Sequence, residues 1–360
     1  FVFFFAVSCM AGRCTVCVTL VAFVVGLIPF VLSYFFGGWV RVHTHNPFQY
    51  TFDDIPDLTG RVAIVTGANT GIGLVTAREM ARKGAHVIMT ARSAEKGQRA
   101  VESVRQAVGA HAEVEYAELD LSSFASVRSF ATRFHAAADT RPLHILVLNA
   151  GVMACPYSSS ADGYEMQIAT NHLGHFLLTK LLLGDLIASA PSRVVAVSSN
   201  AHENPYQPEG IRFDSFAAAG SSETNGYNPL LAYGQSKLAN VLFSNALARR
   251  VEGQRVFVNS CHPGMITTEL GRHIEDALTA LPLGWAVQFL LNTLVRPATM
   301  DPDQGALTQL YLATHPQIES KAIHGQYFEP VVFHKDPSAH AQNVTLQELL
   351  WDMSETHTNS

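Results

Sequence analysis

Short apolar runs alternate with longer helix-periodic stretches through the middle of the chain. The apolar runs predict buried strands at residues 61–66, 86–90, 113–119, 144–148, 193–197 and 255–260. Helical stretches separate them, and a long one extends from about residue 230 to residue 251. Strands that alternate with helices are joined by right-handed crossovers. The pattern therefore predicts an α/β fold with a doubly wound, mainly parallel sheet that carries helices on both faces.

The two ends of the chain have different patterns. Residues 14–40 contain no charged residue, and residues 16–36 are almost entirely apolar, which is enough to cross a bilayer at ~20 residues. We predict a transmembrane helix within a membrane anchor over residues 1–40, and a linker over 41–56. A cleaved signal peptide is the alternative. The first residue is Phe rather than Met, which suggests that this end is incomplete.

The remaining chain divides into a domain over residues 57–335 and a tail over 336–360. Apolar residues at near-helical spacing between positions 338 and 354 predict a final helix that docks on the domain.

Arg13 and Arg41 flank the apolar amino-terminal segment with one charge each, so the orientation of the chain in the membrane stays open. We expect the anchored chain in the endoplasmic reticulum or a related endomembrane.

Composition excludes several classes of function. The net charge is −6 and there is no basic run, which argues against nucleic acid as a partner. The 16 histidines are scattered without metal-ligand spacing, so we expect no metal site. Cys155 and Cys261 are the two of five cysteines that lie outside the apolar amino terminus, and they need not pair.

A glycine-rich turn follows the first predicted strand. Its glycines have the spacing Gly-x-x-x-Gly-x-Gly and open a helix that extends to about Lys83. Backbone amides and the positive end of a helix dipole at such a turn suit an anionic pyrophosphate; a merely tight turn is the alternative. The predicted contacts are Gly67, Asn69, Thr70, Gly71, Ile72 and Gly73.

A tyrosine and a lysine share one face of the long helix near residue 233. Tyr233 and Lys237 are four residues apart, so their side chains lie on the same side of the helix. A free phenol has a pKa of ~10, and a neighbouring cation favours the phenolate. We therefore expect Lys237 to lower the pKa of Tyr233 toward the range useful for acid–base chemistry.

These motifs together resemble those of the short-chain dehydrogenases/reductases, whose fold is Rossmann-like. The resemblance covers about residues 57–330 and appears closest to the retinol dehydrogenases and the WW-domain-containing oxidoreductase, although no WW module precedes the domain. It rests on motifs in the family's order, namely 66–73 (TGANTGIG), 149–151 (NAG), 171–176 (NHLGHF), Ser198-Ser199, Tyr233-x-x-x-Lys237 and 262–264 (HPG).

The resemblance implies roles for four residues. Tyr233 would be the general acid or base, and Lys237 would lower its pKa and hold the nicotinamide ribose. Ser199, rather than Ser198, would hold and polarise the substrate oxygen. Asn171 would fix a helix kink and a water that carries protons onward from the lysine. A turn-capping role for Ser199 or Asn171 is the alternative.

The same resemblance implies the cofactor site. Arg92 follows the second strand, and Ala91 stands where relatives that use NAD carry an acid, so we predict NADP(H). An exposed loop base is the alternative for Arg92. Asp120 would bond the adenine amino group, or cap the helix that begins near Ser122 or Ser123. The other predicted cofactor contacts are Leu121, Asn149, Ala150, Gly151, Tyr233, Lys237, Pro263, Gly264 and Thr268.

Two segments bear on the substrate. Residues 202–229 are longer than a direct loop requires and predict a wall or flap of the pocket. The resemblance implies that residues 265–300 form a substrate lid, and the apolar stretch there favours a lipophilic carbonyl or alcohol such as a retinoid, a steroid or a fatty aldehyde. A core helix or an oligomer interface is the alternative for this stretch. The alternatives are a light-dependent pigment reductase, and a membrane-tethered scaffold that binds nucleotide without turnover. Substrate identity, reaction direction and a homodimer stay open.

Overall fold

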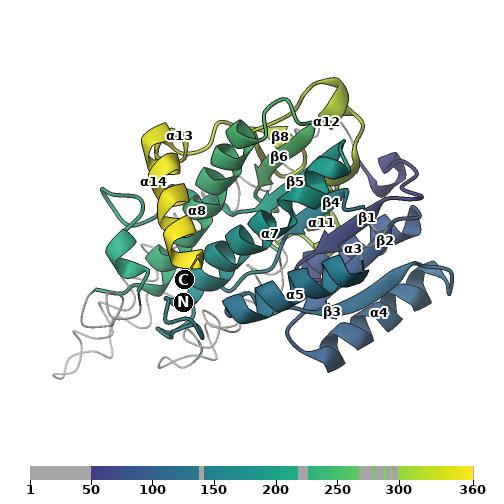
Figure 1. The fold of residues 1–360 in the computed structure, drawn as a ribbon, viewed down its shortest axis with the longest axis horizontal. Coiled ribbons are helices and arrows are strands. Elements are labelled where there is room, and N and C mark those ends of the chain that lie inside the picture. Colours follow the sequence, from purple (N-terminus) through teal and green to yellow (C-terminus); the bar gives the residue numbers. More distant parts are fainter. Residues whose placement is uncertain are drawn as a thin grey trace, which may run out of the picture.

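The fold is built on one mainly parallel sheet. The computed structural model describes residues 50–137, 142–217, 226–266 and 299–359, and single positions 279, 288 and 293. The described residues form an eight-stranded sheet with the order β3-β2-β1-β4-β5-β6-β7-β8 (Figure 1). Neighbouring strands are parallel except β7 and β8, which are antiparallel. The strands are β1 (Val62–Val65), β2 (His86–Ala91), β3 (Val114–Glu118), β4 (Ile145–Leu148), β5 (Ser192–Val197), β6 (Val256–Cys261), β7 (Tyr327–Glu329) and β8 (Phe333–His334).

All six strands predicted from the apolar runs are confirmed, each within two residues at either end. The apolar pattern does not predict β7 and β8, because strands of three and two residues are too short to show a repeating pattern. The strand order reverses between β1 and β4, which places the loops after these two strands on either side of a crevice.

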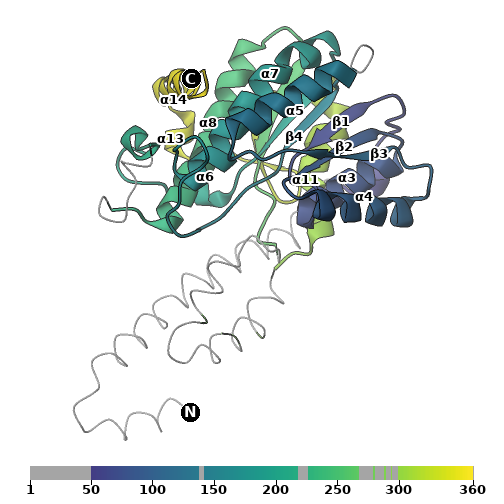
Figure 2. The same ribbon diagram turned by 60° about the horizontal axis from the view of Figure 1, so that its bottom comes forward.

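Helices cover both faces of the sheet, as predicted. One layer contains α3 (Gly71–Arg82), α4 (Ala94–Val108) and α11 (Pro302–Thr314), and the other contains α5 (Phe124–Ala137), α7 (Gly174–Ala188) and α8 (Pro229–Arg250). Figure 2 shows the two layers on opposite sides of the strands. Alternate residues of β1 serve the two layers: Val62 and Ile64 pack with the α5 side, and Ala63 and Val65 pack with the α3 side.

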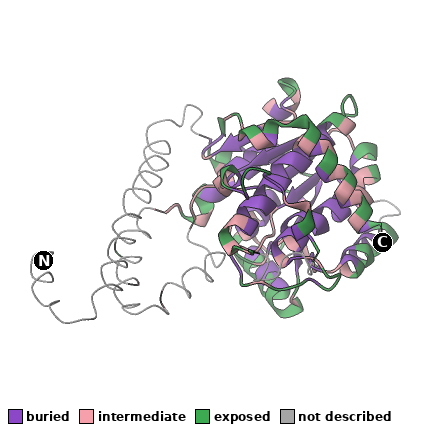
Figure 3. Ribbon diagram, turned by 90° about the vertical axis from the view of Figure 1, so that its left-hand side faces the viewer, coloured by how far each residue is buried: buried purple, intermediate pink, exposed green. Residues whose placement is uncertain are grey.

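The buried core runs through the strands and the inner faces of these helices (Figure 3). The described chain also contains shorter elements. These are η1 (Phe52–Asp54), α6 (Met166–Ile168), the π turn η2 (Ala169–Leu173), η3 (Asn200–Glu203), η4 (Phe213–Ser215), α12 (Gln317–Ser320) and α13 (Ala339–Gln342).

The predicted final helix is present as α14 (Val344–Thr358), which packs against α8. Leu350 is fully buried, whereas Val344 and Leu349 face solvent. The buried face also carries Gln347 and Ser354, so polar residues fill positions that the apolar pattern did not mark.

Several predictions fall on residues outside the described ranges. These are the anchor over 1–40, most of the linker over 41–56, Thr268 and most of the lid over 265–300. Among the residues that the structure does describe, no helix combines the length and the apolar character needed to span a bilayer.

Candidate active site

The predicted site residues gather at the carboxyl ends of β1, β4, β5 and β6. Thr66 follows β1, Asn149 follows β4, Ser199 lies two residues beyond β5, and Pro263 lies two residues beyond β6. Carboxyl ends of parallel strands meet at one edge of a sheet, and ligands of such folds bind there, outside the point where the strand order reverses. The topology thus brings together motifs that lie almost 200 residues apart in the sequence.

The glycine-rich turn is a tightly packed cradle. Gly67 and Gly71 have φ values of +63° and +57°, a region that favours glycine. A Cβ on Gly73 would lie 2.6 Å from the Gly67 carbonyl oxygen and would collide with the Asn149 amide nitrogen. Thr70 caps α3 without a side-chain hydrogen bond, so its hydroxyl does not cover the first amides of the helix. The geometry fits a phosphate group at this helix terminus.

Thr66 joins this turn to the segment after β4. Its hydroxyl oxygen accepts hydrogen bonds from the backbone N–H groups of Asn149 and Ala150, each at 2.9 Å. In return, the Asn149 side-chain amide donates to the Thr66 carbonyl oxygen at 2.8 Å. At Gly151, an added Cβ would lie 3.2 Å from Asn171 Oδ1 and 3.5 Å from Lys237 Nζ. The three residues 149–151 therefore connect the glycine turn to the predicted catalytic side chains.

Tyr233 is buried and bonded to Ser199. Only 6% of Tyr233 is exposed, and its hydroxyl hydrogen-bonds to the Ser199 side chain. Burial raises the pKa of Tyr233 to about 12, although the bond to Ser199 acts in the opposite direction. Our expectation that Lys237 lowers this pKa is therefore wrong for this structure, because desolvation of the phenolate outweighs the favourable contacts.

Lys237 is a buried cation whose hydrogen bond goes to the backbone. Its Nζ donates to the Val197 carbonyl oxygen at 3.0 Å and lies 5.7 Å from the centroid of the Tyr233 ring. No carboxylate forms an ion pair with it in the described part of the chain. Burial lowers the pKa of Lys237 to about 8, so the ammonium can lose its proton close to neutral pH.

The two adjacent serines after β5 have different surroundings. Ser198 is buried, and its hydroxyl donates to the Lys237 carbonyl oxygen at 2.7 Å. Ser199 is partly exposed and contacts the Tyr233 hydroxyl. Of the two serines, Ser199 is therefore the one that lies next to the Tyr233 hydroxyl, and its role toward a substrate stays a prediction. Ser199 also caps η3 by accepting from Ala201 N at 3.1 Å, so the capping alternative is present as well.

Asn171 lies in the π turn between α6 and α7. Its side chain accepts from Val152 N at 2.8 Å and donates to the Val152 carbonyl oxygen at 2.9 Å. It also donates to the Ser236 hydroxyl at 2.9 Å, which ties it to α8 between Tyr233 and Lys237. A helix irregularity is therefore present at Asn171, and the asparagine holds it against the segment after β4.

His175 is a site-supporting residue to which the sequence analysis gave no role. Its Nε2 lies 2.9 Å from the Thr66 hydroxyl, and its Nδ1 lies 3.0 Å from the Asn171 carbonyl oxygen. The carbonyl needs a donor, so Nδ1 carries the proton and Nε2 accepts from Thr66. Burial lowers the pKa of His175 to about 4, which keeps the ring neutral. A histidine four residues after Asn171, one helical turn further along, was the available signal.

The remaining predicted cofactor contacts surround the same edge. Arg92 is exposed just beyond β2, whereas Ala91 is buried. Asp120 accepts from the backbone and the hydroxyl of Ser122, at 2.9 and 2.7 Å. It does not cap α5, which begins at Phe124; the Phe124 backbone N–H donates to the Asp162 carboxylate at 2.8 Å instead.

Beyond β6, Gly264 has a φ of +99°, and an added Cβ there would collide with the sulfur of Met300. Leu121 is buried and approaches Gly174 at the start of α7. In the described residues, no group of His, Cys, Asp or Glu could hold a metal ion. Cys155 and Cys261 are both buried.

Part of the predicted flap packs onto the domain. Within residues 202–217, Ile211 and Phe216 are buried in a cluster with Leu238 of α8. The Arg212 backbone N–H donates to the Gln235 side chain at 2.7 Å. The first half of this segment is therefore fixed against α8; positions 218–225 lie outside the described ranges.

Comparison with known proteins agrees with this geometry. Residues 61–210 match the short chain dehydrogenase family. The chain is 42% identical over 303 residues to retinol dehydrogenase 11 of Homo sapiens, covering 82% of this chain and 85% of that protein. It is 43% identical over 299 residues to the short-chain dehydrogenase TIC 32 B, chloroplastic, of Brassica napus, covering 81% and 87% respectively.

A solved structure shares the fold and much of the sequence. The crystal structure of an uncharacterized protein from Mycobacterium paratuberculosis superimposes with a TM-score of 0.65 at 34% identity, covering 86% of this chain and 98% of that one. The motifs, the strand order and these likenesses lead to one assignment. The chain belongs to the short-chain dehydrogenase/reductase family, a family of oxidoreductases that bind a nicotinamide cofactor.

Proposed function

We propose that the protein is an NADP(H)-dependent oxidoreductase that acts on a lipophilic carbonyl or alcohol. The observation that carries this proposal is the buried hydrogen bond between Tyr233 and Ser199, with the Lys237 ammonium on the same helix face. A proton donor beside a hydroxyl that can hold the substrate oxygen is what carbonyl reduction requires. When bound, the cofactor supplies or accepts the hydride.

The side chains divide the remaining work. Ser199 holds the substrate oxygen next to the Tyr233 hydroxyl, which donates its proton during reduction and takes it back during oxidation. Lys237, with a pKa of about 8, returns a proton to this end of the site. Asn171 keeps the segment after β4 in register with α8 through Val152 and Ser236. Each group is buried or half-buried, which strengthens its electrostatic influence on the reaction.

The cradle at the glycine turn fits the pyrophosphate of a dinucleotide. A Cβ would fill the space at Gly73, and Thr70 leaves the first turn of α3 open to an anion. Arg92 is exposed where β2 ends, and its guanidinium suits the 2′-phosphate of NADP(H). Ala91 offers no carboxylate to hold two ribose hydroxyls, which supports NADP(H) over NAD(H).

The name of one relative and two sequence features support the substrate class and the membrane location. Retinol dehydrogenase 11 carries the name of a lipophilic alcohol, and the apolar stretch within residues 265–300 agrees with such a substrate. A membrane anchor over residues 1–40 would place the site next to a lipid phase. The chloroplastic relative shows that the same family core also serves another compartment, so the endomembrane location stays a prediction.

The test is NADPH oxidation at 340 nm by the purified protein in detergent, with retinal, steroid ketones and medium-chain aldehydes, and NADH in parallel. We expect turnover with NADPH on at least one apolar carbonyl. Tight NADPH binding without turnover on the whole panel would instead support the nucleotide-binding scaffold.

The cofactor preference has its own variant. Arg92→Ala should raise the KM for NADPH about 10- to 100-fold, since a charge-assisted phosphate contact contributes ~1.5–3 kcal/mol, and should leave the KM for NADH unchanged. Arg99→Ala is the matched control, because Arg99 is exposed on α4 and pairs with Glu95. An equal change for both nucleotides in Arg92→Ala would contradict the assigned role.

A further inference from the structure

His202 lies directly behind the predicted catalytic serine. It belongs to η3, the turn that Ser199 caps, and none of its side chain is exposed. Its Nδ1 lies 2.7 Å from the Ser199 carbonyl oxygen. Its Nε2 accepts a hydrogen bond from the backbone N–H of Ser338 at 3.1 Å. One ring thus contacts the active-site edge on one side and the carboxyl-terminal segment on the other.

The two partners fix the protonation of this ring. The Ser338 N–H can only donate, so Nε2 must be the unprotonated nitrogen. The Ser199 carbonyl can only accept, so Nδ1 must carry the proton. Burial lowers the pKa of His202, which keeps the neutral form at neutral pH. Each bond therefore requires the tautomer that the other bond selects.

The surroundings hold His202 and the carboxyl-terminal segment together. The ring packs against Tyr327 of β7, with centroids 4.9 Å apart. Lys335 pairs with Glu203, which follows His202, and with Glu329 of β7, both at 2.8 Å. The segment that leads from β8 to α13 is thereby attached to η3 at two neighbouring residues.

The turn that carries His202 is also packed against Gly234, the residue that follows Tyr233. A Cβ on Gly234 would lie 2.9 Å from the Ala201 carbonyl oxygen and would collide with the carbonyl oxygen of Asn204. No slack exists between η3 and α8 at this point. A displacement of the turn would therefore change the geometry between Ser199 and Tyr233.

We propose that His202 is a positioning residue that sets Ser199 against Tyr233, and that it makes the position of Ser199 depend on the carboxyl-terminal segment through Ser338. This inference rests on the proposed function and adds a second source of control over the same site. His202 does not touch the reacting atoms; it acts through the backbone of Ser199.

Two substitutions of His202 separate its two bonds. His202→Asn retains a donor at the position of Nδ1 and should keep kcat/KM for the carbonyl substrate close to the wild-type value. His202→Gln keeps an amide group near the position of Nε2, where it can still accept from Ser338, but it has no N–H at the position of Nδ1 to donate to the Ser199 carbonyl. It should lower kcat/KM about 10- to 100-fold, as expected for a misplaced catalytic group, with the KM for NADPH unchanged. Equal losses in the two variants would point to a merely structural role and overturn the proposal.

The partner residue provides a test that leaves the site intact. Ser338 has a φ of −54°, which proline adopts, so Ser338→Pro removes the N–H with little strain. Ser338→Ala removes only the hydroxyl that caps α13. We expect Ser338→Pro to lower kcat/KM about tenfold and Ser338→Ala to leave it unchanged, because Nε2 without its donor can take the proton from Nδ1. The same kcat/KM in both variants would refute the coupling.

A spectroscopic readout separates this inference from the proposed function. Long-range ¹H–¹⁵N spectra of the full chain report the tautomer of each histidine, and His202→Gln identifies the resonance of His202. We expect the Nδ1–H tautomer in the wild type and in Ser338→Ala, and a shift toward Nε2–H in Ser338→Pro. Absence of turnover in the wild type would count against the proposed function alone, whereas an Nε2–H tautomer in the wild type would overturn the role of His202.

Discussion

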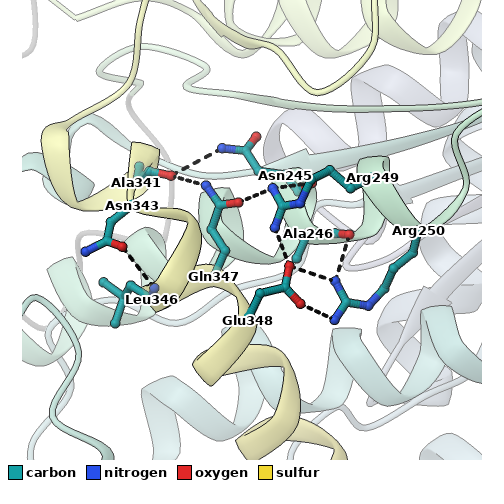
Figure 4. A network of polar contacts seen from close by, with 9 residues as sticks. All are labelled: Asn245, Ala246, Arg249, Arg250, Ala341, Asn343, Leu346, Gln347 and Glu348. Carbon is teal, nitrogen blue, oxygen red and sulfur yellow. Dashed lines mark hydrogen bonds and ion pairs between the residues drawn. The ribbon is translucent and has the colours of Figure 1, made fainter.

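Two parts of α8 carry cations in opposite settings. In its first half, Lys237 is 3% exposed and has no carboxylate partner among the described residues. Near its end, Arg249 and Arg250 both pair with Glu348 of α14, at 2.5 Å in each case (Figure 4). Burial lowers the pKa of Lys237 to about 8, and the two arginines lower the pKa of Glu348 to about 2. One helix therefore carries a buried cation without a carboxylate partner and, further along, two cations that are paired with one.

The carboxyl-terminal contact is a surface clamp around an aromatic centre. The Arg250 guanidinium lies 4.0 Å from the centroid of the Trp351 ring, which in turn packs on Phe176 of α7 at 4.9 Å and on Phe243 of α8 at 6.1 Å. These contacts fasten α14 across α7 and α8. Apolar contact and cation–π attraction both act in the direction of stability here.

The difference between these two settings shows which residue lowers the stability of the fold. A buried lysine without a carboxylate disfavours its charged form and lowers the free energy of unfolding. A chain selected for stability alone would place an apolar residue at position 237. In the clamp, by contrast, each cation has a carboxylate partner and the aromatic rings pack on one another, so every contact favours the folded state. We therefore propose that α8 serves catalysis around Lys237 and stability at its end, and the following substitutions test this division.

The largest effect is expected at Tyr233. Tyr233→Phe removes the hydroxyl that donates the proton and should lower kcat by about 10³-fold, within the usual range for a general acid. NADPH binding and thermal unfolding should change little, because the ring still fills its buried site. Turnover above about one tenth of the wild-type value would contradict the assignment.

The second effect is on stability rather than on rate. Trp351→Ala should lower the free energy of unfolding by about 2–3 kcal/mol, below the range for a fully buried tryptophan because Trp351 is only half-buried. The kcat of the folded enzyme should not change. Leu349→Ala on the exposed side of α14 is the matched control and should have almost no effect. Urea titration with a parallel rate assay measures both quantities.

The smallest effect is expected for the ion pairs of the clamp. Glu348 is 41% exposed in its side chain, so solvent screening limits Glu348→Gln to about 0.5–1 kcal/mol. The folded-state pKa of about 2 lies below the unfolded value, so the wild-type advantage is present above about pH 4.5 and is lost as pH falls toward 2. Unfolding curves at pH 7 and pH 3 should show this loss. An advantage that grows toward pH 3 would have the wrong sign.

Local patterns predicted the parts of the fold that depend on neighbouring residues. The six apolar strands, the glycine turn and the spacing of Tyr233 and Lys237 could be read from the sequence, because periodicity and helix geometry fix them. The pKa of Tyr233 could not be predicted from the sequence, because it depends on how strongly the folded domain excludes water from the phenol. The spacing showed the cation and not the degree of desolvation.

Long-range contacts account for the rest of what the sequence did not reveal. His202 and Ser338 are 136 residues apart, and Arg250 and Glu348 are 98 apart, so no local pattern connects them. The buried side of α14 includes Ser354, which bonds His172 at 2.7 Å, and polar pairs of this kind do not appear in an apolar repeat. Such contacts form only when the complete fold brings distant segments of the chain together.

Lys237→Met tests the division of α8 most directly. Methionine fills the site without a charge, and the Val197 carbonyl keeps its bond from Asn240 at 3.1 Å. We predict a loss of turnover of about 10³-fold together with a free energy of unfolding raised by about 1–3 kcal/mol at pH 7.

The difference in the free energy of unfolding between Lys237→Met and the wild type should depend on pH. The folded-state pKa of about 8 lies below the unfolded value, so the wild-type penalty is complete below pH 8 and disappears between pH 8 and about 10.5. Equilibrium unfolding of Lys237→Met and wild type at pH 7 and pH 10 should therefore show a gap that narrows with rising pH. A variant that is less stable than the wild type at pH 7, or that keeps its turnover, would contradict the account.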